Sequence, residues 1–248
     1  MTKPLGDDLH FFYGTLPQPC PYLPDRMESK IVTELVGDDA RGLHERLSRA
    51  GFRRSHNLVY KPACKGCGAC IPVRVPVTGF SPSRSLKRVW RRNADLIATE
   101  KAAEATGEQF AVFARYQHWR HRGGGMASMD FNDYKSMVED TPIDTMIVEF
   151  HDHEGKFFGA SLTDRLGDGL SGVYKFFEPS EPQRSAGTYI VLWHIERARE
   201  LGLEYVYLGY WIAGCSKMSY KTRFRPIEAL GPDGWRLMDD DAREILRE

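Results

Sequence analysis

Three cysteines lie close together in the segment CKGCGAC, residues 64–70, and no other short stretch of the chain constrains the local fold as strongly. The spacing is C-x-x-C-x-x-C, and the intervening Gly66 and Gly68 let the backbone turn around one centre. Zinc binds thiolates in a tetrahedron, and iron–sulfur clusters are also held by cysteines. The segment therefore favours a metal or cluster site built from Cys64, Cys67 and Cys70.

Such a site needs a fourth ligand, and two further cysteines are available. Cys20, in the segment CPYLP, lies in the same N-terminal half, whereas Cys215 lies far along the chain and is expected to be a buried thiol. The pattern does not choose between zinc and iron–sulfur. The alternatives are reduced thiols without a role, a thioredoxin-like redox pair, and a nucleophile assisted by His56.

Length and composition restrict the setting of these cysteines. The chain has 248 residues, enough for one large or two modest domains with their own cores, so stability does not require the cysteines. Its start lacks the profile of a secretory signal, and no apolar run approaches the roughly 18 residues that span a bilayer. We expect a soluble cytoplasmic protein without a membrane partner, where clustered cysteines bind metal or react more often than they form disulfides.

Charge is balanced overall but unevenly distributed. The chain has 34 basic and 34 acidic residues, yet the stretches from Arg74 to Arg92 and from Lys217 to Arg225 contain no acid. Two basic patches on a neutral chain indicate a defined anionic partner. The acidic ending DDDAREILRE is expected to be a solvated, helix-prone end.

Hydrophobic periodicity predicts an order of elements that changes character near residue 145. Helices are expected over residues 38–50, 86–105, 108–121 and 188–201. Strands are expected over residues 30–35, 52–62, 71–77, 145–150, 157–163, 170–177, 204–212, 226–230 and 235–238. Pro72 and Pro76 would place the strand 71–77 at a sheet edge or a bulge.

Antiparallel strands followed by a helix and another strand predict an α+β fold of the GNAT-like acyltransferase kind, with a mixed, mostly antiparallel sheet flanked by helices. The segment QRSAGTY supports this prediction, because Arg184 and Gly187 have the R-x-x-G spacing with which such folds cradle a pyrophosphate on helix amides. The motif is weak alone, and its place between a strand and a helix strengthens it. We expect a cysteine-containing domain with a basic helix over 1–106 and the transferase domain over 107–248.

Three stretches of the chain resemble one known family. They are GFRRSHNLVYKPACKGCGACIPVRVPVTGFSPSRSLKR (51–88), GLSGVYKFF with SAGTY (169–177 and 185–189), and LEYVYLGYWIAGCSKMSYKTRFRPIEAL (203–230). Together they make nearly the whole chain similar to the aminoacyl-tRNA–protein transferases, and in particular to their bacterial leucyltransferase branch.

The resemblance implies transfer of leucine from leucyl-tRNA to the N-terminal aspartate or glutamate of acceptor proteins, which marks them for proteolysis as N-degrons. It implies three partners: the tRNA, the acceptor proteins and a downstream protease adaptor. No cofactor is required for the transfer. The related eukaryotic enzymes transfer arginine and have N-terminal cysteines implicated in an iron–sulfur cluster, but their cysteine spacing differs from that of this chain. Arginine therefore stays open as the alternative donor.

The implied reaction is aminolysis of an ester, which needs little base catalysis because an α-amine has a pKa near 7.7–8. Positioning and hydrogen-bond donors can then supply most of the acceleration. Asp164, at a strand end, is the candidate acid–base or amine-binding carboxylate, with turn capping as its alternative. The candidates to orient the amine or the ribose hydroxyl, or else to be core tyrosines, are Tyr174, Tyr189, Tyr207 and Tyr210.

The anionic substrates require cations. The acceptor's acidic side chain is expected to bind the basic segment after the last core strand, namely Lys217, Lys221, Arg223 and Arg225, with Arg223 or Arg225 favoured because arginine grips carboxylates with two donors. The tRNA is expected to bind the basic helix through Arg84, Lys87, Arg88, Arg91 and Arg92, with Trp90 nearby for stacking. Arg184 and Gly187 would meet its terminal nucleotides. The alternative for each segment is a solvated basic surface.

Two rival functions fit parts of the sequence. A non-catalytic zinc-containing RNA-binding protein would use the cysteines and the basic helix, but it leaves the glycine motif and the later cations unexplained. A coenzyme A-dependent N-acetyltransferase would need a complete pyrophosphate loop, of which QRSAGT has only part.

Overall fold

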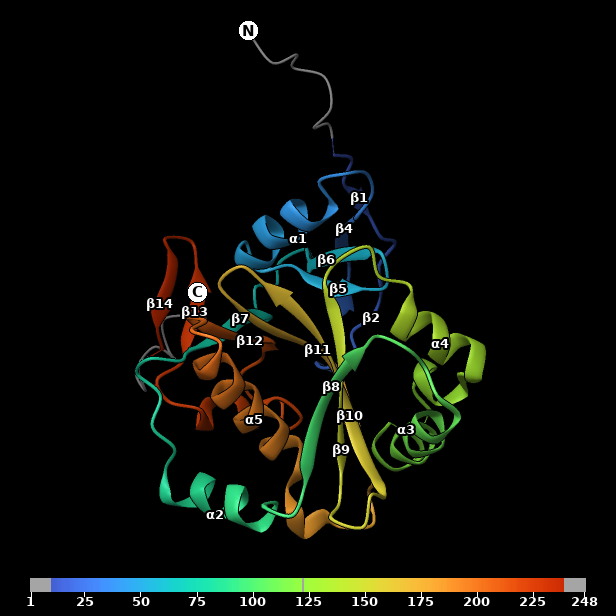
Figure 1. The fold of residues 1–248 in the computed structure, drawn as a ribbon. Helices are drawn as coiled ribbons and strands as arrows, with labels where there is room; N and C mark the ends of the chain where they lie inside the picture. Colours follow the sequence, from blue (N-terminus) through green and yellow to red (C-terminus); the bar gives the residue numbers. More distant parts are fainter. Residues whose placement is uncertain (1–9, 122, 239–248) are drawn as a thin grey trace, which may run out of the picture.

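A computed structural model describes residues 10–121 and 123–238 of the protein. Its largest element is an eight-stranded sheet whose neighbouring strands are antiparallel, except for the parallel pair β11 and β12 (Figure 1). In spatial order the strands are β14 (Gly234–Leu237), β13 (Glu228–Gly231), β7 (Ile71–Pro76), β12 (Tyr205–Trp211), β11 (Gly169–Phe177), β10 (Phe157–Leu166), β9 (Thr145–His151) and β8 (Ile97–Ala102).

Helices cover both faces of this sheet. On one face lie α2 (Arg84–Arg92) and α5 (Ala186–Glu200), and on the other lie α3 (Gly107–Arg120) and α4 (Phe131–Glu139) (Figure 1). Side chains of a strand alternate between faces. In β9, Val148 therefore packs with the core under α5, whereas its neighbour Ile147 packs with the core under α3 and α4.

A smaller sheet lies beside the large one. Its order is β1 (Tyr13–Gly14), β4 (Lys30–Glu34), β6 (Leu58–Pro62) and β5 (Arg53–Ser55), and it packs on α1 (Ala40–Arg49). A two-stranded ribbon of β2 (Gln18–Pro19) and β3 (Met27–Glu28) lies between β1 and β4 in the chain. The expected single strand over 52–62 is thus a hairpin, with His56 at its turn in the left-handed backbone region (φ 55°).

Of the two predicted positions for the strand 71–77, the sheet edge is wrong, because β7 lies between β12 and β13, whereas its ladder with β12 does contain a bulge, between Tyr207 and Gly209. Proline has no N–H to donate to a neighbouring strand. The pairing of β13 is accordingly confined to Val73 and Arg74, two of the three residues between the prolines. The prolines limit the length of one ladder rather than placing the strand at an edge.

The predicted helix over 86–105 is also wrong in its second half. It ends at Arg92, where the buried Asn93 donates its side-chain amide to the carbonyls of Val89 and Arg184, and residues 97–102 form the edge strand β8. Pairing with β9 overrides the helical preference of the alanine- and glutamate-rich stretch. Helix α4, begun by a capping box of Asp130 and Asp133, was not expected.

The large sheet does not divide at the boundary predicted near residue 106, since β7 and β8 precede that boundary and pair with later strands. The remaining short helices are η1 (Gly125–Ser128), η2 (Pro182–Arg184) and η3 (Ser219–Arg223). Among the described residues, no helix is long and apolar enough to cross a membrane. The expectation for the ending DDDAREILRE falls outside the described residues.

Candidate functional site

The strands β11 and β12 form a fork. They pair in parallel only where Gly169–Ser171 lie beside Tyr205–Tyr207, and then they separate. Each strand carries an irregularity just beyond this point, β11 against β10 and β12 against β7. Helix α5 connects the two strands, so the fork opens at their carboxyl ends, where sheets with parallel strands commonly bind ligands.

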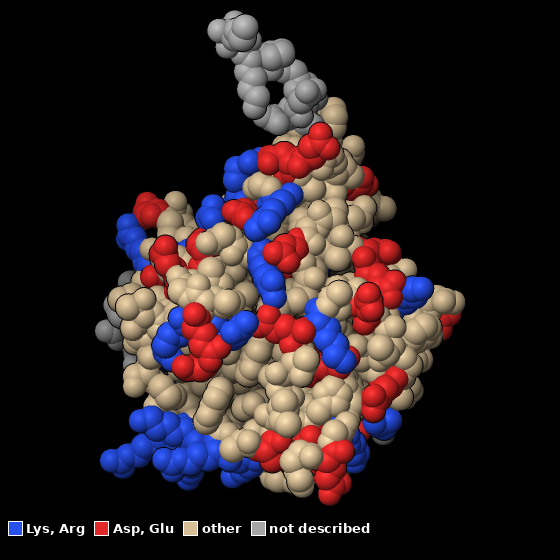
Figure 2. Space-filling view, in the orientation of Figure 1, with Lys and Arg blue, Asp and Glu red and all other residues tan. Residues whose placement is uncertain are grey.

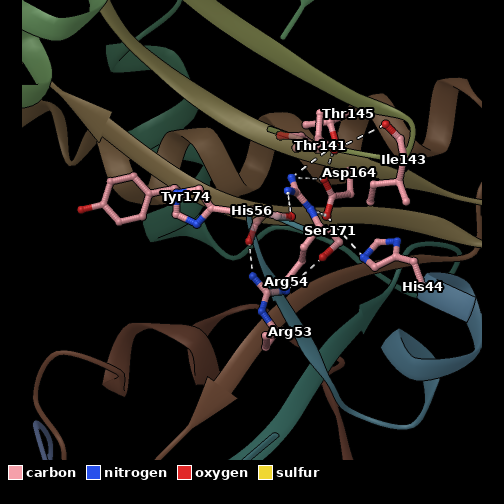
Figure 3. Close-up of polar contacts among 12 residues, drawn as sticks. His44, Arg53, Arg54, His56, Thr141, Ile143, Thr145, Asp164, Ser171 and Tyr174 are labelled. Carbon is pink, nitrogen blue, oxygen red and sulfur yellow. Dashed lines mark hydrogen bonds and ion pairs between the residues drawn. The ribbon is translucent and has the colours of Figure 1, made fainter. Parts of the chain in front are cut away.

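Arg53 lies at the point where the strands separate. From β5 of the small sheet, its guanidinium donates to Ser171 Oγ at 2.9 Å and to the carbonyl of Gly172, both on β11 (Figure 3). On β12 it meets Gly209, which has a φ of +73° and where a Cβ would come within 2.9 Å of Arg53 Nε. Glycine at this position therefore provides both the turn and the space that Arg53 occupies.

Each arm of the fork holds a lysine amine. Lys175 lies on β11, donates to the carbonyl of Gly187 in the first turn of α5 at 3.0 Å, and has its amine 5.0 Å from the ring centre of Tyr220. Lys221 is only 5% exposed and donates to the carbonyl of Tyr210 on β12. Burial lowers the pKa of Lys175 to about 7. Burial, and then the positive charges of Arg53 and Lys175, lower the pKa of Lys221 well below its usual range.

Asp164 lies in a closed ionic cluster on β10 and is fully buried. Arg54 grips its two oxygens at 2.7 and 2.8 Å, Thr145 donates to it at 2.9 Å, and His44 of α1 lies 3.4 Å away (Figure 3). This burial contradicts the predicted acid–base role, because a carboxylate enclosed by these partners cannot reach a substrate. The cluster instead fastens α1 and β5 to the large sheet.

The candidate tyrosines are packed in different parts of the molecule. The hydroxyl of Tyr207 donates to Asp168 at 3.0 Å, and that of Tyr210 lies 2.9 Å from the carbonyl oxygen of Gly51. Tyr174 accepts from Gln117 at 2.6 Å, and Tyr189 is buried beside Trp90, with ring centres 5.5 Å apart. Burial raises the pKa of Tyr189 to about 12. The structure does not bring the four together.

The four cations expected to bind the acidic side chain are also separated. Only Lys221 lies in the fork, whereas Lys217 and Arg223 are exposed and Arg225 donates to the carbonyl of Met238 at 2.5 Å. Arg53 and Lys175 were not among the residues predicted from the sequence. Two signals in the sequence could have found them. Arg53 and Arg54 are consecutive in a strand, so their side chains must point to opposite sides. Lys175 is a lone charge in the apolar strand GLSGVYKFF.

The basic helix α2 forms a surface of its own. Figure 2 shows a continuous patch of Lys and Arg over the place of α2 in Figure 1. Leu86 and Val89 face the core, and the exposed cations are Arg84, Lys87, Arg88, Arg91 and Arg92. None of them is ion-paired with a carboxylate of the described residues, and Trp90 beside them is 38% exposed.

The guanidinium of Arg184 is occupied by protein carboxylates. It binds both oxygens of Asp95, at 2.8 and 2.9 Å, and Glu181 at 2.6 Å. The Asp95 hydrogen bonds raise the pKa of Arg184 above its usual range. Gly187 does lie in the first turn of α5, but its carbonyl is bound by Lys175. These contacts favour a structural role for Arg184.

The four candidate cysteine ligands line one pocket, together with Tyr22, Tyr60 and Tyr210. Burial, and next the neighbouring Cys64, Cys20 and Cys67, raise the pKa of the Cys70 thiol to about 12. Within residues 10–121 and 123–238, however, no three His, Cys, Asp or Glu side chains are arranged as a metal site. Cys215 is buried, as expected.

The sheet, its two helical layers and the forked parallel pair define a GNAT-like acyltransferase fold, as predicted. The crystal structure of FemX shares this fold, with a TM-score of 0.51 at 8% identity, covering 89% of this chain and 74% of that one.

Sequence comparison then gives the family. The chain is 59% identical to an aspartate/glutamate leucyltransferase of Paramagnetospirillum magneticum, over 92% of this chain and 93% of the relative. A leucyltransferase of Parvibaculum lavamentivorans is 56% identical over 91% of this chain and 93% of its own. The profiles "Arginine-tRNA-protein transferase, N terminus" and "C terminus" match residues 18–88 and 108–231. The chain belongs to this family of aminoacyl-tRNA–protein transferases.

Proposed function

We propose that this protein transfers leucine from leucyl-tRNA to the N-terminal aspartate or glutamate of acceptor proteins. The observation that carries the proposal is the identity of 59% to a named leucyltransferase along almost the whole of both chains. The acceptor proteins then become substrates for proteolysis through the N-degron pathway, with a protease adaptor as the downstream partner. The cytoplasm is the compartment that fits a tRNA substrate, and none of the five cysteines is in a disulfide.

The chemistry is acyl transfer. The acceptor's neutral α-amine attacks the ester carbonyl of leucyl-tRNA, an amide bond forms, the ester C–O bond breaks, and the amine's proton ends on the released ribose hydroxyl. The free α-amine has a pKa near 7.7–8, so a useful fraction is neutral at cellular pH. Catalysis then depends on holding amine and ester together, which we assign to the fork of β11 and β12 beside the first turn of α5.

The exposed face of α2 is the surface that we assign to the tRNA backbone. Exposed cations follow a phosphate chain well, and each contact releases counterions, so binding weakens as salt increases. Replacing Lys87 or Arg88 with alanine should lower tRNA affinity and reduce the slope of log K against log salt by about one per residue. Lys156→Ala, an exposed lysine between β9 and β10, is the matched control. An unchanged salt slope in both α2 variants would contradict this assignment.

One assay tests the transfer itself. The protein is incubated with leucyl-tRNA, arginyl-tRNA or acetyl-coenzyme A and with peptides that begin with aspartate, glutamate, lysine or alanine. We expect leucine on the aspartate and glutamate peptides, detected by mass spectrometry. Arginine on the same peptides would instead identify the alternative donor. Acetylation, or no transfer from any donor, would contradict the proposal.

We also propose that the pocketed thiols Cys20, Cys64, Cys67 and Cys70 hold zinc or an iron–sulfur cluster. Four thiols in one pocket fit either group by donor type, and a bound group would cross-link the loop 64–70 to the N-terminal segment. Metal and sulfide analysis of anaerobically purified protein would distinguish the two. Cys67→Ser should lower the metal content and the melting temperature. A metal-free wild-type protein that is folded and active would contradict this assignment.

A further inference from the structure

Arg53, Lys175 and Lys221 form a group of cations at the fork, and the described part of the chain supplies no counter-ion to them. Arg53 lies where the fork begins, Lys175 on the β11 arm, and the amine of Lys221 against the β12 arm. Within residues 10–121 and 123–238, none of the three is ion-paired with a carboxylate. They donate hydrogen bonds to carbonyl oxygens and to one hydroxyl. Because these acceptors are uncharged, they do not neutralise the positive charges.

Such an arrangement is costly unless an anion completes it. Burying a charge without a partner is strongly unfavourable, and like charges near one another add to the cost. The pKa of Lys221 shows both effects, being lowered first by burial and then by Arg53 and Lys175. An anion placed between the three cations would offset the cost of burial and the repulsion between the like charges. Its binding would also raise the lowered pKa of Lys175.

The position of the group indicates which anion this is. A phosphate of a polynucleotide backbone needs cations at the surface, as on α2, whereas Lys221 is only 5% exposed. A carboxylate at the tip of a short, flexible side chain is smaller than a phosphodiester and is better suited to approach an amine that is mostly buried. Two lysines and an arginine approaching from different elements can surround its two oxygens with donors.

We infer that Arg53, Lys175 and Lys221 bind the side-chain carboxylate of the acceptor's N-terminal residue and so select aspartate and glutamate. This inference rests on the proposed function and assigns its specificity to named side chains. It replaces the expectation that Arg223 or Arg225 selects the acidic residue.

The test compares acceptor peptides that differ only in charge, beginning with glutamate or glutamine and with aspartate or asparagine. The variants are Lys175→Met and Lys221→Met, which keep the length of the side chain and remove its charge. We expect the ratio of kcat/KM for the glutamate peptide to that for the glutamine peptide to fall about 30-fold or more in each variant. Most of the loss should be an increase in KM for the acidic peptide.

Two variants serve as comparisons. Lys156→Met removes an exposed lysine between β9 and β10 and should leave the ratio unchanged. Lys217→Met removes an exposed cation of the segment that sequence analysis favoured, and it should also leave the ratio unchanged. Thermal melts and affinity for charged tRNA are measured for every variant, so that a folding defect in one lysine variant leaves the other to decide.

The outcomes separate the inference from the function on which it rests. Wild-type protein without preference for acidic peptides would contradict the proposed function. Wild-type preference that survives in folded Lys175→Met and Lys221→Met would contradict the inference alone. Loss of tRNA affinity with unchanged peptide selectivity would assign the three cations to the nucleic acid and overturn it as well.

Discussion

Arg53 and Arg54 are neighbours in β5, yet they have opposite electrostatic surroundings. Arg54 enters a closed cluster in which Asp164, also completely buried, neutralises its charge. Arg53 points to the fork, where it donates to a hydroxyl and a carbonyl and where its charge lowers the pKa of Lys221; none of the carboxylates of the described residues is paired with it. The comparison teaches that a buried charge neutralised within the protein serves the fold, whereas one left open is available to a ligand.

The largest expected effect comes from breaking the closed cluster. Arg54→Met leaves the Asp164 carboxylate buried without its main partner, which should lower the free energy of unfolding by about 3–5 kcal/mol. Arg53→Met removes two hydrogen bonds and strands no carboxylate, so its cost should be about 1–2 kcal/mol. Urea unfolding at neutral pH measures both.

A second substitution checks the reason for that difference. The double variant Arg54→Met with Asp164→Leu removes both charges, and it should recover most of the stability lost in Arg54→Met alone. Equal losses in Arg53→Met and Arg54→Met, or no recovery in the double variant, would show that the two arginines do not differ in the way proposed.

A decrease of intermediate size in the free energy of unfolding is expected when the pH is lowered. Burial lowers the pKa of His44, which lies beside Asp164, from 6.5 to about 4. Between these values the unfolded chain binds the proton and the folded protein does not, so stability decreases as the pH falls from 6.5 towards 4. The loss from His44 should reach about 3 kcal/mol.

The variant His44→Gln keeps a hydrogen-bond donor but does not titrate. Its unfolding free energy should depend less steeply on pH over this range than that of the wild type. The buried His194, whose pKa burial lowers to about 3, titrates in both proteins and acts in the same direction. Identical slopes in the two proteins would contradict the assignment to His44.

The sequence predicted the features that depend on a local pattern or on the resemblance to the family. Periodicity identified the strands that became β9 to β12 and the helix α5, and the resemblance identified the enzyme class. It could not predict partners set by tertiary structure. The residues of β8 have a helical preference, and only their pairing with β9 makes them a strand. Asp164 was predicted to be accessible to substrate, but Arg54, which is distant in sequence, binds and encloses it. The selector cations were likewise assigned to one contiguous segment, although the fork gathers them from β5, β11 and η3.

The smallest expected change in the free energy of unfolding is an increase, whereas the changes above are decreases. If the fork carries an uncompensated charge, Lys175→Met should stabilise the ligand-free protein at pH 6, where the amine is protonated in both folded and unfolded states. The net gain should be about 1–2 kcal/mol, because removal of the buried charge is partly offset by loss of the hydrogen bond to Gly187. Burial lowers the pKa of Lys175 to about 7 from 10.5. Between these values the folded amine is neutral while the unfolded one still holds its proton, so wild-type stability rises with pH.

The advantage of Lys175→Met should therefore be smaller at pH 9 than at pH 6, which urea unfolding at the two values measures. Lys221, His194 and Tyr220 are the titratable groups that interact with Lys175 among the described residues, and none is a carboxylate. A destabilised Lys175→Met protein at pH 6 would mean that the lysine is compensated in the folded protein. The distinction between the open group around Arg53 and the closed cluster around Arg54 would then be lost.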